Sequence, residues 1–265
     1  MKDILCRVER LSVTYRTPAG RHSALKSVSL DIKVGEKLAI IGESGSGKST
    51  LALALTGLLP AEAMVEGDIV WTGRGSAPLP GRDIGIVFQD PGSSLNPVLT
   101  IGEQVGEGAR HHLGLGRKAA RDKAIELLAR VRLPHPEQAV GAYPHQFSGG
   151  QRQRIAIAAA IAAGPSVLIA DEATSALDTI VQAEIAALLE DLVQTGDMTL
   201  IFVTHDIGLA ASLADRIAVF RTAELVEFGD AGSIVNTPQA GYTRQLLATH
   251  IDLDSPRLVG ASDVR

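Results

Sequence analysis

The sequence of 265 residues holds a single cysteine, Cys6. One thiol cannot form an internal disulfide, and it cannot supply an all-cysteine metal cluster within one chain. A reducing compartment is the expected environment of such a protein. Aromatic residues are also scarce, at 3% of the chain, and this Ala- and Gly-rich composition suits tightly packed helices and strands of a globular protein.

Long apolar runs are missing as well. The most apolar stretch, residues 155–170, is broken by Gly164 and Pro165, so it stays short of the roughly 18 apolar residues that a membrane span needs. Charged residues such as Asp3 and Arg7 interrupt the N-terminal segment, and no signal peptide is expected. If the protein works at a membrane, another protein has to anchor it.

An excess of positive charge is absent too, because the formal net charge at pH 7 is -5. Such a chain does not attract a polyanion, and we expect no nucleic-acid partner. The exception is the basic segment, residues 117–132, in which Asp122 and Glu126 are interspersed. We interpret it as the solvated face of a helix, with a nucleic-acid patch as the less favoured alternative. Its basic residues are Arg117, Lys118, Arg121, Lys123, Arg130 and Arg132.

Short apolar strands alternate with helical patterns along the chain. Strands are expected at 37–41, 84–88, 167–170, 199–203 and 217–220, and helices at 49–58, 151–163 and around 181–192. This alternation favours an α/β fold with a mostly parallel sheet that helices cover. Residues up to about 31 alternate as antiparallel strands do, whereas about 90–147 is expected to be a helical insertion. Beyond Gly229 we expect loops, a short helix and a frayed tail.

A glycine-rich loop joins the first of these apolar strands to a helix. Its residues are Gly42, Glu43, Ser44, Gly45, Ser46, Gly47, Lys48, Ser49 and Thr50. This is the phosphate-loop pattern in the strand–loop–helix context that it requires. Glycines let successive N–H groups face phosphate oxygens, and the helix adds its positive end. Lys48 would bring a charge to the terminal phosphates of ATP, and the Ser49 hydroxyl would bind Mg²⁺. A loop that binds nothing is the less favoured alternative.

Two acidic residues, Asp171 and Glu172, directly follow the expected strand at 167–170. Asp171 would hold Mg²⁺, directly or through water. Glu172 is placed to orient or deprotonate an attacking water, as a general base must. Without a phosphate loop in the chain, these residues would be better explained as two solvated acids at the end of a strand. Because a phosphate loop is present, we favour the catalytic explanation.

The string Phe-Ser-Gly-Gly-Gln-Arg-Gln-Arg at 147–154 resembles the signature motif of ABC ATPases. Ser148, Gly149, Gly150 and Gln151 at the start of a helix suit anion binding through backbone N–H groups and the helix dipole. A plain helix cap is the alternative explanation. The resemblance implies that these residues bind the ATP held by the phosphate loop of another subunit.

Other motifs of the ABC family occur in the family's order. Tyr15 matches the aromatic residue that stacks on adenine, and Gln89 matches the Q-loop glutamine, which would reach both nucleotide and metal. Ser175–Ala176–Leu177–Asp178 matches the D-loop, with Asp178 at the nucleotide, and His205 matches the catalytic switch histidine. Each residue alone has a plainer explanation, such as a strand aromatic, a loop amide or a surface histidine.

The resemblance covers about residues 4–235. It implies a RecA-like P-loop NTPase core with an N-terminal antiparallel β subdomain and an α-helical subdomain inserted at about 90–150. Residues 236–265 would be a C-terminal extension. Only one set of motifs occurs, so the chain is expected to work with a second ABC ATPase subunit, in a homodimer or a heterodimer.

Three further segments closely resemble the ATPases of bacterial peptide, nickel and opine importers. They are residues 87–97, 143–146 and 237–247. This resemblance implies transmembrane permease subunits, an extracytoplasmic solute-binding protein and a peripheral position on the cytoplasmic face of the inner membrane. Many members of the group carry a longer tail with a cysteine-ligated iron–sulfur cluster. No cysteine occurs in the corresponding part of this chain, and no cluster is expected.

One position departs from the family pattern, since Ala173 stands where proline usually follows the catalytic glutamate. Proline would fix φ and remove an N–H, whereas alanine relaxes the loop and retains both acids, so activity should survive. Two other functions stay open. A soluble single-cassette ABC ATPase could serve an assembly pathway such as iron–sulfur cluster biogenesis. Alternatively, the chain could be a nucleotide-gated binding module that hardly hydrolyses ATP, although the presence of Lys48, Glu172 and His205 argues against this function.

Overall fold

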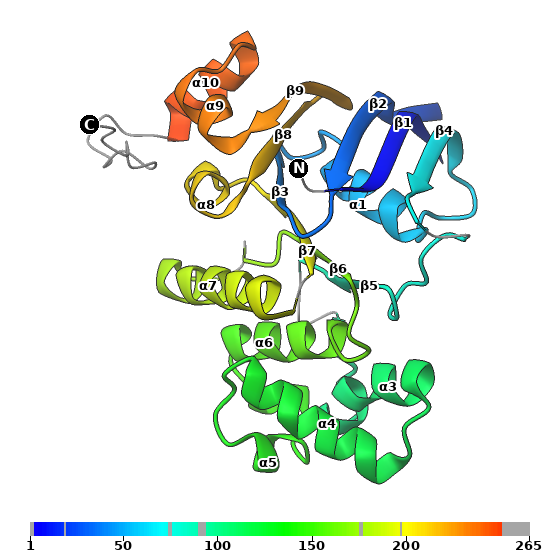
Figure 1. The fold of residues 1–265 in the computed structure, drawn as a ribbon, viewed down its shortest axis with the longest axis vertical. Helices are drawn as coiled ribbons and strands as arrows, with labels where there is room; N and C mark the ends of the chain where they lie inside the picture. The colour runs from blue at the N-terminus through cyan, green and yellow to red at the C-terminus, as the bar shows by residue number, and fades with distance from the viewer. Residues whose placement is uncertain are drawn as a thin grey trace. The chain divides into compact units, whose positions relative to one another are not determined.

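The computed structural model describes residues 3–18, 20–73, 76–89, 94–174, 177–196 and 198–250. The chain divides into two compact units, Met1–Ala77 with Ile201–Arg265 and Pro78–Leu200, and each is described by itself. The expected frayed tail lies outside the described residues. Strands and helices alternate along the chain (Figure 1), which confirms the expected α/β class.

The first unit contains a three-stranded antiparallel sheet in the order β2-β1-β4. Its strands are β1 (Ile4–Thr17), β2 (Gly20–Lys33) and β4 (Met64–Trp71). Leu11 pairs with Val28 and Val13 with Leu25, and these four side chains are buried. The antiparallel prediction for this segment is therefore confirmed. β4 was not predicted, because most of its residues are exposed and no apolar alternation marks it.

The same unit contains parallel strands that carry the phosphate loop. β3 (Lys37–Gly42) pairs in parallel with β8 (Arg216–Arg221), and β8 pairs antiparallel with β9 (Glu224–Asp230). β3 is buried from Leu38 onward, as expected of a strand covered on both faces. β9 was not predicted because charged residues interrupt its apolar ones and none of its residues is fully buried.

Helices of the first unit begin and end at identifiable capping residues. α1 (Lys48–Thr56) stops where Gly57 adopts a left-handed conformation with φ 71°, two residues before the predicted limit of 58, because glycine takes this conformation without strain. α8 (Ile207–Leu213) begins at Asp206, whose side chain accepts a hydrogen bond from the N–H of Leu209. The single short helix expected after Gly229 is two helices, α9 (Ala231–Asn236) and α10 (Gly241–His250).

The second unit combines parallel strands with a group of helices (Figure 1). β5 (Ile84–Val87) pairs in parallel with β6 (Val167–Asp171). The helices are α3 (Ile101–Leu113), α4 (Arg117–Arg130), α5 (Pro136–Ala139), the 3₁₀ turn η1 (Pro144–Gln146), α6 (Gly149–Ala160) and α7 (Thr179–Gly196). α6 ends three residues before the predicted limit of 163. β7 (Thr199–Thr204) contains the boundary between the units.

Packing explains two of the sequence expectations in this unit. Ile185, Leu188, Leu189 and Leu192 are buried on α7, and their spacing of one to four residues places them on one face of the helix predicted around 181–192. On α4 the buried residues are Ala120, Ala124, Leu127 and Leu128, whereas most basic side chains of the basic segment are exposed. The prediction that this segment is a solvated helix face is confirmed.

Candidate functional site

The phosphate loop takes a path that only glycine permits at two positions. Gly42 has φ 146° and Gly47 has φ 104°. A Cβ atom at residue 42 would lie 2.1 Å from the carbonyl oxygen of Phe220, and one at residue 47 would lie 2.3 Å from that of Ala24. The loop is therefore packed directly against the backbone of β8 and β2. Gly45, with φ 75°, has open space around it.

The side chain of Lys48 is held across the loop from the first position of α1. Lys48 is only 4% exposed, and its Nζ donates hydrogen bonds to the carbonyl oxygens of Gly42 at 2.9 Å and Glu43 at 2.8 Å. These two carbonyls fix the ammonium group over the loop. A positive charge in this position suits an anionic ligand.

Ser46 contributes a second feature that fits a ligand rich in oxygen atoms. Ser46 is 3% exposed, and its Oγ has no hydrogen-bond partner in the part of the chain that the structure describes. Buried polar atoms nearly always have a partner. A hydroxyl without one, beside a lysine ammonium and at the start of a helix, fits the phosphate group of a nucleotide.

Tyr242, which was not predicted as a site residue, contacts the loop from the C-terminal part of the chain, and Arg221 packs against it. The Tyr242 hydroxyl, on α10, accepts a hydrogen bond from the backbone N–H of Glu43 at 3.3 Å. The Arg221 guanidinium carbon lies 4.8 Å from the centre of the Tyr242 ring. Burial raises the pKa of Tyr242, so the phenol stays protonated at neutral pH. No local pattern links these residues to the loop, because the contact depends on tertiary packing.

The remaining predicted residues of the first unit lie on three elements. Tyr15, on β1, donates from its hydroxyl to Oγ1 of Thr50 at 3.4 Å, so it lies at the first turn of α1. Ser49 in that turn is exposed, and His205, which follows β7, is also exposed. The structure thus places Tyr15 beside the helix that follows the phosphate loop.

The acidic pair of the second unit lies where the sequence predicted it, at the end of β6. Asp171 is the last residue of the strand and is buried, and Glu172 is half-buried. Glu172 has φ 48°, a left-handed conformation that costs free energy for a residue other than glycine and that clusters at functional sites. Ala173 is 5% exposed. The chain therefore holds the Glu172 carboxylate on a strained turn.

The signature string forms the start of α6. The Ser148 Oγ accepts from the Gln151 N–H at 3.3 Å, and the Gln151 Oε1 accepts from the Ser148 N–H at 3.0 Å. This capping box is the helix cap that was weighed as the alternative. A Cβ atom at Gly150 would lie 2.6 Å from Cγ1 of Val181, so α6 approaches the first turn of α7 closely. Ser148 and Gly149 are exposed.

The Q-loop and D-loop are described only in part. Gln89 is exposed two residues beyond β5, whereas Asp90, Pro91 and Ser93 lie outside the described residues. Ser175 and Ala176 lie outside them as well. Asp178 is exposed, and its Oδ1 accepts from the N–H of Val181 at 3.0 Å. Asp178 therefore caps the start of α7.

Within the described ranges, no helix is both long enough and apolar enough to cross a lipid bilayer. This matches the absence of long apolar runs in the sequence.

Comparison with known proteins gives consistent matches. Residues 25–175 match the family model described as ABC transporter. The chain is 42% identical over 261 residues to the oligopeptide transport ATP-binding protein OppD of Bacillus subtilis, covering 95% of this chain and 73% of that protein. It is 44% identical over 259 residues to a putative peptide import ATP-binding protein of Brucella abortus, covering 94% and 78%.

Solved structures show the same likeness. A dimeric, post-hydrolysis state of the ATP-binding cassette MJ0796 bound to ADP and Pi superposes with a TM-score of 0.73 at 31% identity, covering 86% of this chain and 99% of that one. The cbiO1 protein of Clostridium perfringens, part of the transporter complex cbiONQ, superposes with a TM-score of 0.72 at 29% identity, covering 92% and 100%. These neighbours confirm the predicted P-loop fold.

Proposed function

Because this chain belongs to the ABC transporter family of ATP-binding proteins, we propose that it binds and hydrolyses ATP to power import of a solute through a separate permease. The relatives carry the names of oligopeptide, dipeptide and peptide transport proteins. A peptide is accordingly the first choice of solute, and an opine or a nickel chelate is the next.

The observation that carries this proposal is the geometry of the phosphate loop around Lys48 and Ser46. Lys48 is buried and held by two loop carbonyls, and the Ser46 hydroxyl is buried without a partner among the described residues. Both features suit the phosphates of ATP, which Gly42 to Thr50 would cradle through backbone N–H groups. Tyr15 would stack on adenine.

Hydrolysis needs a metal ion and a base, and the chain has residues of the right chemistry for both. Ser49, Gln89 and Asp171 would hold Mg²⁺, which, when bound, neutralises charge on the phosphates. Glu172 would orient or deprotonate the attacking water, and His205 would stabilise the transferring phosphate.

A second subunit completes the proposed site. Ser148 to Gln151 and Asp178 would act on the ATP held by the phosphate loop of a partner ATPase. The MJ0796 cassette that superposes with this chain is dimeric, which supports a paired arrangement. Closure on two ATPs and reopening after hydrolysis would drive the permease, provided that the two states interact with the permease differently.

The proposed working complex contains permease subunits and an extracytoplasmic solute-binding protein, with this chain peripheral on the cytoplasmic face of the inner membrane. Residues 4–235 would form the ABC ATPase domain, with a helical subdomain at about 90–150, and residues 236–265 a C-terminal extension. The names of the relatives favour transport over the soluble assembly role.

Co-purification tests this proposal. The tagged chain is isolated from its native cells in mild detergent with ATP, and its partners are identified by mass spectrometry. A polytopic membrane protein supports the proposed role, particularly together with an exported solute-binding protein. A soluble scaffold in place of the membrane protein would refute import and support the assembly alternative.

A further inference from the structure

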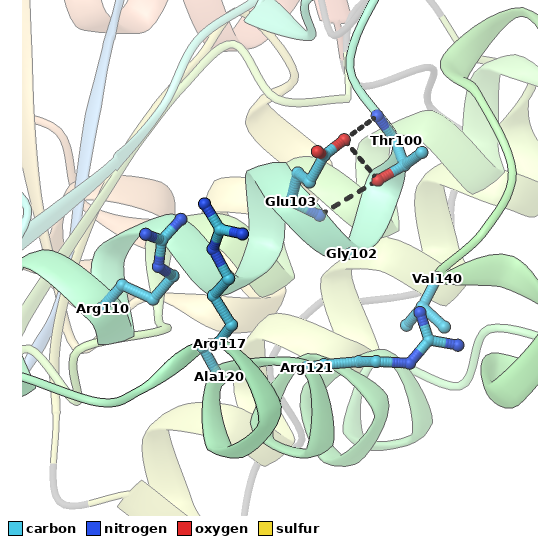
Figure 2. A pocket seen from close by; sticks show the side chains of 8 residues that line it. All are labelled: Thr100, Gly102, Glu103, Arg110, Arg117, Ala120, Arg121 and Val140. Atoms are coloured by element: carbon cyan, nitrogen blue, oxygen red, sulfur yellow. Dashed lines mark hydrogen bonds between the residues drawn. The ribbon is translucent and has the colours of Figure 1, made fainter.

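A cavity of about 330 Å³ lies in the helical part of the second unit, between α3, α4 and the segment that follows α5. Three arginines line it: Arg110 near the end of α3, and Arg117 and Arg121 in the first turns of α4. In Figure 2 the guanidinium groups of Arg110 and Arg117 point the same way, while Arg121 extends toward Val140. None of these residues belongs to the proposed ATP site.

The three guanidinium groups have no ion-pair or hydrogen-bond partner among the residues that the structure describes. Two other residues of the basic segment do have partners there, since Lys123 pairs with Glu126 at 2.7 Å and Arg132 pairs with Asp191 at 3.3 Å. The cavity therefore brings together Arg117 and Arg121 of this segment with Arg110 of α3, none of which has such a partner among the described residues.

One acidic side chain lines the same cavity, but it is already engaged. The Glu103 Oε2 accepts from the backbone N–H of Thr100 at 2.9 Å and from its hydroxyl at 2.7 Å. The Thr100 side chain lowers the pKa of Glu103, with a further contribution from the backbone N–H. Glu103 thus caps α3 as a carboxylate, and the lining keeps two positive charges in excess, from three arginines and one glutamate.

Like charges in one cavity repel each other, and an anion placed between them removes that repulsion. A planar guanidinium group matches the oxygen atoms of phosphate and carboxylate groups in a bidentate manner. The cavity volume lies at the lower end of the range for small-ligand sites, roughly 300–1,000 Å³. We propose that Arg110, Arg117 and Arg121 form a second anion site, separate from the ATP site, that binds a phosphoryl group.

Such a phosphoryl group could belong to a free phosphorylated molecule or to the headgroup of an anionic lipid. The chemistry of recognition is the same for both, so the experiment has one arm for each source. Both arms use the full chain with its phosphate loop saturated by a non-hydrolysable ATP analogue, so that binding at Lys48 cannot contribute.

In the first arm, inorganic pyrophosphate is titrated into the chain by calorimetry. In the second, the chain is floated with vesicles of phosphatidylglycerol or of phosphatidylcholine. The test variant is Arg110→Ala with Arg117→Ala. The matched control is Lys118→Ala, which removes an exposed charge from the same turn of α4 without altering the cavity lining. The affinity for the ATP analogue and the thermal midpoint show that each variant is folded.

We expect saturable binding in at least one arm, weakened at least roughly tenfold in the double arginine variant, as loss of charge-assisted hydrogen bonds predicts. Lys118→Ala should stay within about twofold of the parent, as expected for an exposed charge outside the cavity. Binding of pyrophosphate identifies a soluble ligand, and binding to phosphatidylglycerol vesicles alone identifies a lipid. Absence of binding in both arms would overturn the proposal, and so would an equal loss in the Lys118 variant.

Discussion

The hydroxyl of Tyr242 accepts a hydrogen bond from the backbone N–H of Glu43 at 3.3 Å, although the two residues are 199 positions apart in the sequence. Tyr242 is 8% exposed, and its ring lies against the Arg221 guanidinium. Helix α10 therefore supports the proposed phosphate loop directly. The turn between β8 and β9 also contacts this loop, because the Ala223 N–H donates a hydrogen bond to the Ser46 carbonyl oxygen at 3.1 Å.

Replacing Tyr242 by phenylalanine removes this acceptor and keeps the ring. We expect a loss of about 1 kcal/mol in the free energy of unfolding, the usual value of one hydrogen bond, and weaker ATP binding by up to roughly fivefold. Urea unfolding and nucleotide titration measure the two effects. Tyr143→Phe, the same change on a ring that is 40% exposed, is the control. Equal effects in both variants would remove Tyr242 from its supporting role.

Replacing Lys48 by alanine should weaken ATP binding by roughly 10- to 150-fold, because hydrogen bonds to charged groups contribute about 1.5–3 kcal/mol. A fluorescent nucleotide analogue measures the affinity. Lys118→Ala serves again as the control for loss of a lysine charge. Unchanged affinity in the Lys48 variant would show that its ammonium group does not contact the nucleotide.

The glycines of the loop should differ in their tolerance of alanine. Gly45→Ala meets open space and should cost about 1–2 kcal/mol, the penalty of a left-handed conformation. Gly47→Ala adds a Cβ atom 2.3 Å from the Ala24 carbonyl oxygen, so it should destabilise the protein clearly more. Urea midpoints of the two variants decide this. A similar cost for both would mean that the contact with β2 is easily relaxed.

Cys6 is fully buried on β1, and burial raises the pKa of its thiol to about 12 from a model-compound value of 9.0. The native thiol should therefore resist alkylation at pH 8, since the thiolate is the reactive form. The unfolded thiol loses its proton at lower pH than the native one, so this group stabilises the fold below pH 9 and its contribution falls as pH rises toward 12. Alkylation rates with and without urea test this, and equal rates would contradict the burial.

The buried ion pair of Arg216 and Glu36 joins the base of β8 to the turn before β3. The Nε and Nη2 atoms of Arg216 donate hydrogen bonds to the Glu36 carboxylate oxygens at 2.8 and 2.9 Å, and Glu36 is only 2% exposed. Glu36→Ala should destabilise the protein by about 1.5–3 kcal/mol, the usual value of a hydrogen bond to a charged group, because Arg216 then keeps only its contacts with Asp31, whose carboxylate lies 3.5 Å away. The exposed pair Lys123–Glu126 provides the control, since Glu126→Ala should cost less than about 1 kcal/mol.

Short-range patterns were sufficient for much of the fold. Buried strands such as Leu38–Ile41 and Val167–Ala170 are continuous apolar runs, and the helical face of α7 follows from its spacing. β4 and β9 were missed because they are partly exposed strands of mixed composition, which owe their position to neighbouring strands rather than to a pattern of their own. The end of α1 at Gly57 was predicted two residues too late, because Pro60 just beyond it is also a signal for the end of a helix.

The site divides in the same way. The phosphate loop and the acidic pair are contiguous in sequence and were predicted from their pattern, whereas the signature string was recognised by its resemblance to the ABC motif. Tyr242 reaches the loop only through the packing of α10 within the first unit, where Arg221 lies against its ring. The arginine cavity depends on the packing of α3 against α4. Contacts of this kind join residues far apart in the chain, so no pattern in the sequence predicts them.

The most direct test of the proposed function is the rate of phosphate release by Glu172→Gln. The variant keeps the shape of the side chain at the end of β6 but removes its basicity. Our account predicts that it binds ATP as tightly as the parent and forms a stable ATP-bound dimer. It also predicts that the variant releases phosphate at least roughly 100-fold more slowly, as expected when a general base is lost. Glu137→Gln, an exposed glutamate of α5, should release phosphate at the parent rate. Undiminished phosphate release by Glu172→Gln would contradict the account.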